Sequence, residues 1–124
     1  MIIAVILNEA TKPILVELTR DVRLIAPRSL PWEMGNAFSA MFKRKRLSVA
    51  EATTAFQIYQ QLPISLVEVS FETALHLSAQ LNIYAYDAYL LACALKYRSP
   101  LLSLDKKLVQ SAKQLNLAVL EVTL

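Results

Sequence analysis

Short apolar segments alternate with longer amphipathic segments from residue 22 to the end of the chain. The apolar segments have the length of strands and cover residues 22–26, 64–69, 101–104 and 117–122. The segments between them have the spacing of helices and cover about residues 31–42, 49–60, 71–81, 87–97 and 106–115. Strands that alternate with helices usually pair in parallel. The pattern predicts an α/β fold in which a parallel sheet is flanked by helices, in one domain of residues 1–124.

Start signals support several of these helices. Ser48, with Glu51 three residues later, has the spacing of a capping box. Pro31 suits the first turn of a helix, because its missing N–H would have no partner there. Ser70 and Asp105 are placed to cap the helices that follow them.

The first residues of the chain allow two interpretations. Residues 2–7 are all apolar, and such a short run suits a buried strand or part of a buried helix. Pro13 permits a helical turn that continues to about residue 19. This apolar run has no basic segment before it and is too short for a signal peptide or a membrane span. We therefore expect a cytoplasmic protein with no membrane partner.

Composition narrows the possible functions. Hydrophobic residues make up 56% of the chain and charged residues 19%, which indicates a compact core. A single cysteine excludes an internal disulfide framework, and a single histidine cannot form a zinc site. The net charge of +3 is small for a dedicated nucleic-acid binder. Four consecutive basic residues nevertheless form a basic block (residues 43–46), which either is a solvated helix end or contacts phosphates: Lys43, Arg44, Lys45 and Arg46.

Three acidic residues fall where a parallel sheet would bring them to one end. Glu33 and Asp87 lie near helix starts, and Asp105 follows a strand. Each could simply be a helix-start or strand-end acid. Together they would repel one another unless a hard cation such as Mg²⁺ or Mn²⁺ neutralised them. Such an ion activates water and stabilises charge on a phosphate.

Aromatic residues surround one of these acids. Tyr84, Tyr86 and Tyr89 lie near Asp87, where they could stack on a base or pack in the core. Trp32 is predicted to lie in the core or in a dimer interface.

Three short motifs carry a resemblance to a known family. Residues 26–37, 86–94 and 101–105 read APRSLPWEMGNA, YDAYLLACA and LLSLD. In this order they resemble the PIN-domain family, and within it the VapC-like toxins of toxin–antitoxin pairs. The resemblance implies a metal-dependent endoribonuclease with a parallel sheet flanked by helices. It also implies Mg²⁺ or Mn²⁺ held by four acids, a homodimer, RNA as substrate and an antitoxin as protein partner.

The resemblance assigns roles to individual residues. Glu33, Asp87 and Asp105 match the second, third and fourth acids of the family. Asp87 would bind the metal directly, and the other two directly or through water. Asn36 and Ser103 match supporting polar positions. The basic block would guide the RNA backbone.

The first acid of the family has no clear counterpart. Residues 2–13 resemble the helix that follows the family's first strand, so that strand and its aspartate are expected to be missing. Either residues 2–7 form this helix, which the spacing from Asn8 to Pro13 favours, or they replace the central strand. The second arrangement would place Asn8 or Glu9 near the position of the absent acid.

The predicted function is therefore that of a PIN-type endoribonuclease. Because one metal-binding aspartate is expected to be missing, this chain is expected to bind metal weakly and to cleave RNA poorly or not at all. The alternative is a non-catalytic module of the same fold that dimerises or binds protein or RNA. A receiver-like domain would need paired acids at an early strand end, which the sequence lacks.

Overall fold

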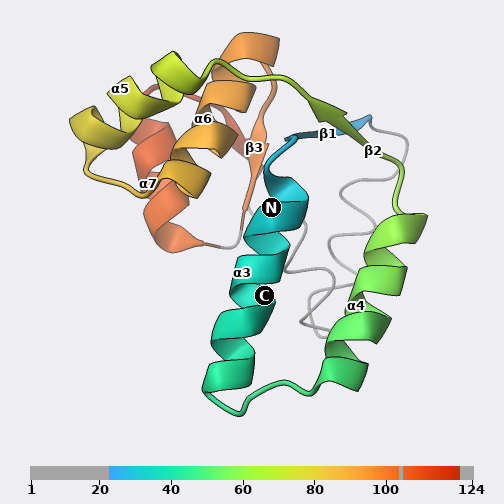
Figure 1. Ribbon diagram of the computed structural model, residues 1–124. Helices are drawn as coiled ribbons and strands as arrows, with labels where there is room; N and C mark the ends of the chain where they lie inside the picture. Colours follow the sequence, from blue (N-terminus) through green and yellow to red (C-terminus); the bar gives the residue numbers. More distant parts are fainter. Residues whose placement is uncertain (1–22, 104, 121–124) are drawn as a thin grey trace.

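The computed structural model describes residues 23–103 and 105–120. Strands and helices follow one another through these residues (Figure 1): β1 Leu24–Pro27, α3 Leu30–Lys43, α4 Val49–Gln61, β2 Ile64–Val67, α5 Phe71–Leu81, α6 Ala85–Tyr97, β3 Leu101–Leu102, α7 Lys106–Gln114 and β4 Val119–Leu120. The predicted order of elements is confirmed over this range, although the strands are shorter than predicted. The two interpretations of residues 2–7 and the predicted helix at 13–19 lie outside the described residues.

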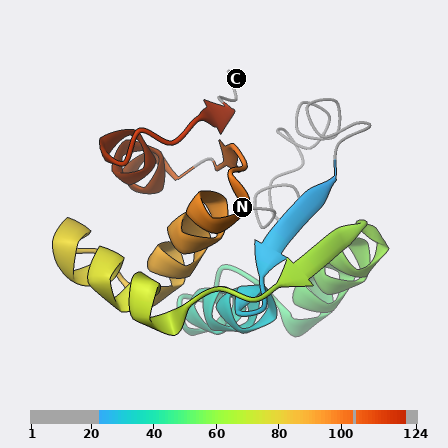
Figure 2. The same ribbon diagram turned by 90° about the horizontal axis from the view of Figure 1, so that it is seen from above.

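All the strand pairs of the described residues are parallel, as predicted. β1 pairs with β2 in a register that places Leu24 opposite Ile64. β3 pairs with β4, and Leu101 lies opposite Val119. Within residues 23–103 and 105–120 these are two separate two-stranded sheets, which lie apart in Figure 2. The α/β class with helices around parallel strands is confirmed, in agreement with a PIN-like α/β/α arrangement.

One hydrophobic cluster joins β1 to the helical pair α3 and α4, which lie side by side in Figure 1. Leu30, Met34 and Phe38 follow one another at four-residue intervals and therefore share one face of α3. They pack with Ala26 of β1 and with small side chains of α4. This packing fixes the first turn of α3 close to the end of β1.

A second cluster surrounds α6, which is the most buried helix of the described chain. Its residues from Leu90 to Ala94 are buried without interruption, so several faces of the helix are covered. α5 packs along it, and β1 contacts it from another side. Leu101, Leu108 and Ala112 add side chains from β3 and α7. The first turn of α6 is thereby held next to β1 and the start of α3.

The ends of the helices confirm some predictions and correct another. The Ser48 and Glu51 capping box is present, with hydrogen bonds of 3.0 and 3.1 Å between side chains and backbone N–H groups. α6, however, begins at Ala85, two residues earlier than predicted, because Tyr84 takes the extended conformation of an N-cap without a capping side chain. Asp87 therefore lies inside the first turn. Among the described helices, none has both the length and the apolar character needed to cross a membrane.

Candidate active site

Glu33 lies in the first turn of α3, half-buried and unpaired. α3 follows directly on β1, and its N-cap Ser29 accepts a backbone hydrogen bond of 2.9 Å from the Glu33 N–H. The Oε2 atom of Glu33 is buried and has no hydrogen-bond partner among the described residues. The pKa of the Glu33 carboxyl is raised from 4.5 to about 7, mainly because the group is buried, and the charges of Asp87 and Asp105 contribute to this rise. Within residues 23–103 and 105–120, this oxygen therefore lacks the hydrogen-bond donor that a buried carboxylate normally requires.

Asp87 occupies the third position of α6 and is also half-buried. A helix start normally favours the charged form of a carboxyl group. Here burial has the larger effect and raises the pKa of Asp87, and the charge of Asp105 adds to this rise. Asp87 is thus a second carboxyl group that loses its proton less easily than usual.

Asp105 is the N-cap of α7, as predicted. Its Oδ1 atom accepts hydrogen bonds from the backbone N–H groups of Lys107 at 2.9 Å and Leu108 at 3.3 Å. Its own backbone N–H donates to the Oγ of Ser103 at 3.0 Å. Ser103 is only 5% exposed, so this hydrogen bond fixes the turn that carries Asp105. One oxygen of the carboxylate is engaged in capping.

The three acids act on one another although they come from three separate elements. The charge of Asp105 raises the pKa of both other carboxyl groups, and that of Asp87 raises the pKa of Glu33. Such mutual repulsion requires that the groups lie within a short range of each other. The three carboxyl groups are thus electrostatically coupled, while their role as a common site stays a prediction.

No three acidic, histidine or cysteine side chains in residues 23–103 and 105–120 lie close enough to form a ready-made metal site. The donor chemistry still fits a hard cation, because the three side chains supply carboxylate oxygens and one of these is buried without a partner. Mg²⁺ commonly keeps several waters and uses only one or two carboxylates of the protein. A complete cage of protein ligands is therefore not required.

The supporting residues fall in different places. Asn36 is exposed one turn after Glu33 on α3, whereas Ser103 is buried beneath Asp105. The basic block is exposed at the opposite end of α3. Ten residues separate Lys43 from Glu33 along the helix, which corresponds to about 15 Å. The block can act on an extended ligand but lies away from the acids.

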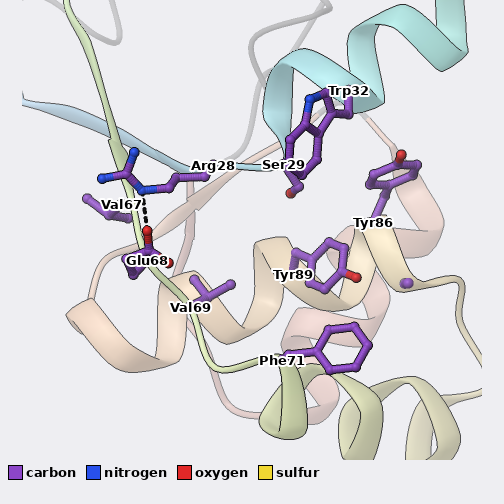
Figure 3. A pocket seen from close by; sticks show the side chains of 10 residues that line it. Arg28, Ser29, Trp32, Val67, Glu68, Val69, Phe71, Tyr86 and Tyr89 are labelled. Atoms are coloured by element: carbon purple, nitrogen blue, oxygen red, sulfur yellow. Dashed lines mark ion pairs between the residues drawn. The ribbon is translucent and has the colours of Figure 1, made fainter.

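A pocket of about 610 Å³ beside the acids was not predicted from the sequence. Trp32 is one of its lining residues and is 70% exposed, so the interpretation of Trp32 as a core residue is wrong. Figure 3 shows Trp32 from α3 and Tyr86 from α6 on the same pocket. The sequence contains one signal for this pocket: Trp32 directly precedes Glu33, and Tyr86 directly precedes Asp87.

The chain was compared with known protein families and with curated proteins. The model of the family described as PIN domain matches residues 1–114. A search of the curated proteins gave no match. The family match covers the elements that carry Glu33, Asp87 and Asp105.

Proposed function

The chain belongs to the PIN domain family, and from this premise we propose that it is a metal-dependent endoribonuclease. Membership in the family suggests a nuclease that acts on RNA and generally uses a divalent metal ion. We further propose that Glu33, Asp87 and Asp105 hold the metal ion, which is Mg²⁺ or Mn²⁺. The proposed biological role of the chain is that of a VapC-like toxin whose activity is controlled by an antitoxin.

The observation that carries the proposal is the unpartnered Glu33 carboxylate. A carboxylate oxygen that is buried without a hydrogen bond is costly, and its pKa of about 7 reflects that cost. The charges of Asp87 and Asp105 also raise the pKa of Glu33. Without a cation, this repulsion would make the site still less stable. A binding site for a cation explains why the fold keeps these charges together.

The chain's own residues have separable parts in this proposal. Asp87 projects from the first turn of α6 and is proposed as a direct ligand. Glu33 offers Oε2, and Asp105 offers the oxygen that does not cap α7. Ser103 keeps the Asp105 turn in place. A bound Mg²⁺ or Mn²⁺ would supply an activated water and would stabilise the charge that develops on the scissile phosphate.

Asp87→Asn tests the proposal directly, because the amide keeps the size of the side chain and removes its charge. The assay follows cleavage of a single-stranded RNA by the full chain, with Mn²⁺ or Mg²⁺ and with EDTA. Cleavage should require the metal and disappear in Asp87→Asn. Glu72→Gln removes an exposed acid from α5 and should leave cleavage unchanged. Cleavage that persists in EDTA would contradict the mechanism.

The non-catalytic module remains the second candidate function, because no ready-made three-acid group exists among the described residues. Calorimetric titration with Mn²⁺ separates the two candidates. Binding that is lost in Asp87→Asn supports the nuclease. No detectable binding, together with unchanged RNA affinity in Asp87→Asn, supports the module.

The toxin role and the homodimer need experiments of their own. Induction of the chain in growing bacterial cells should arrest growth, and Asp87→Asn should abolish the arrest. Growth that continues normally with active protein would contradict the toxin role. Light scattering on purified protein should give the mass of two chains, and the mass of one chain would contradict the dimer.

A further inference from the structure

The pocket that Trp32 and Tyr86 help to line is formed by five elements. Its lining comes from the end of β1 and the first turn of α3, the end of β2, the start of α5 and the first turn of α6. Figure 3 shows Trp32, Tyr86, Tyr89 and Phe71 around one side, and the ion pair of Arg28 with Glu68 on the other. Its volume of about 610 Å³ lies in the range of pockets that hold small organic groups.

Four aromatic residues line this pocket, and two of them, Trp32 and Phe71, are exposed. Trp32 is 70% exposed and Phe71 is 61% exposed, which is unusual for such large apolar side chains. The ring of Tyr89 is 6.0 Å from that of Tyr86 in an edge-to-face arrangement and 6.4 Å from that of Phe71. These contacts hold three rings in fixed orientations around the opening. A planar aromatic group could stack on them.

A buried polar group gives the pocket a second recognition element. Ser29 lines it and is 9% exposed, and its Oγ has no hydrogen-bond partner within the part of the chain that the structure describes. A serine hydroxyl can both donate and accept a hydrogen bond, which suits the edge of a heterocyclic base. In Figure 3 this hydroxyl lies close to the Trp32 ring, on the same side of the pocket.

The charges at the rim do not oppose a phosphate chain. Glu68 would repel one, but it is paired with Arg28, whose guanidinium has further N–H donors for phosphate oxygens. The backbone oxygen of Glu68 also accepts hydrogen bonds from Lys96 Nζ at 3.1 Å and Tyr97 Oη at 3.2 Å. This wall of the pocket is therefore anchored to α6.

The pocket and the acids share the same two helix starts. Trp32 precedes Glu33 on α3, and Tyr86 precedes Asp87 on α6. Consecutive helical side chains differ in direction by about 100°, so the aromatic and acidic groups face adjoining surfaces. The pocket and the acids thus share their supporting elements, α3 and α6.

We propose that this pocket is a subsite that holds an unpaired base of single-stranded RNA next to the acids. The inference rests on the proposed ribonuclease function and adds how the substrate is held. Base stacking on Trp32 and Phe71, a hydrogen bond to Ser29 and phosphate contact with Arg28 explain each unusual feature of the pocket. A double helix, whose bases are already stacked, would not enter it.

Trp32 makes the proposal measurable, because it is the only tryptophan of the chain. The full chain is titrated in EDTA with ten-nucleotide oligouridine and oligoadenosine, and tryptophan fluorescence is followed. Stacking should quench the fluorescence in a saturable way. An abasic ribose-phosphate oligomer of equal length has the same charge and should not quench. Equal quenching by the abasic oligomer would overturn the proposal.

Substitutions then locate the base. Trp32→Ala and Phe71→Ala should each weaken oligonucleotide binding about five- to hundredfold, whereas Trp32→Phe should retain most of the affinity. Phe56→Ala is the matched control, since Phe56 is a 41% exposed phenylalanine on α4 outside this pocket. Losses no larger than that of Phe56→Ala would overturn the proposal. So would a change of oligomeric state without any change in RNA binding, which would assign the pocket to a contact between copies.

These results are independent of catalysis. Quenching and weakened variants without metal-dependent cleavage would support the base subsite and contradict the nuclease. Metal-dependent cleavage with unaltered RNA binding in Trp32→Ala and Phe71→Ala would support the nuclease and contradict the subsite.

Discussion

The hydroxyl oxygen of Ser103 accepts a hydrogen bond of 3.0 Å from the backbone N–H of Asp105. Asp105 in turn caps α7 through its Oδ1 atom. The buried serine therefore connects the end of β3 to the start of α7. Through this connection it sets the position of a carboxylate whose charge acts on Glu33 and Asp87.

Ser103→Ala should lower the free energy of unfolding by about 1 kcal/mol, because a buried N–H loses its acceptor. Urea denaturation measures this as a lower midpoint at an unchanged slope. Ser39→Ala is the matched control. The Ser39 hydroxyl donates to the backbone oxygen of Asn36 on the exposed side of α3, and its loss should change stability by less than about 0.5 kcal/mol. Equal effects of the two substitutions would show that Ser103 has no special structural part.

The pKa of Glu33 predicts how stability depends on pH in metal-free protein. Between pH 4.5 and about 7 the folded protein keeps a proton on Glu33 that the unfolded chain has already released. The contribution of protonated Glu33 to the free energy of unfolding is therefore fully present below pH 4.5 and is lost as the pH rises through about 7. The loss amounts to at most about 3 kcal/mol.

Glu33→Gln provides the comparison, since glutamine is neutral throughout this range. In EDTA, the variant should gain stability relative to the wild type as the pH rises from 5 to 8. Urea denaturation at a series of pH values measures the difference. Parallel pH profiles for the two proteins would show that Glu33 is not the titrating group.

The basic block is expected to contribute to RNA affinity in a salt-dependent way. Arg44→Gln removes one exposed charge from this block, and Arg23→Gln removes one exposed charge at the start of β1. If Arg44 contacts a phosphate, the slope of log affinity against log salt should decrease by about 0.7 in Arg44→Gln. Fluorescence anisotropy of a labelled RNA at several salt concentrations measures it. The same slope in both variants would show that Arg44 does not make a specific contact with an RNA phosphate.

Much of this fold could be predicted because its signals are local. The capping box of Ser48 with Glu51 and the cap formed by Asp105 each depend on residues within three positions, and both are present. The start of α6 was placed too late because an extended Tyr84 gives no recognisable capping signal. Parallel topology, which places strand ends and helix starts together, is the basis for predicting that Glu33, Asp87 and Asp105 share one site, and this stays a prediction.

The pocket could not be predicted, since it depends on how separate elements approach one another. Trp32 was predicted to lie in the core or in a dimer interface because of its size, yet α3 packs through Leu30 and Met34 and leaves Trp32 exposed. The unpartnered Ser29 hydroxyl has no sequence signal at all. Such features arise from tertiary packing, and only the structure shows them.

The ends of the helices offer a test that is independent of function. The chain has one glycine, and the left-handed positions of the described residues are taken by Lys45, Asn82, Arg98 and Asn116. Arg98 ends α6 with a φ of 50°, where its N–H donates to the oxygen of Leu95. A side chain at such a position is strained, and glycine is not. Arg98→Gly should therefore stabilise the protein by about 1 kcal/mol relative to Arg98→Ala, which removes the same charge but keeps the Cβ atom. Thermal denaturation compares the two variants directly, and equal midpoints would contradict a left-handed Arg98.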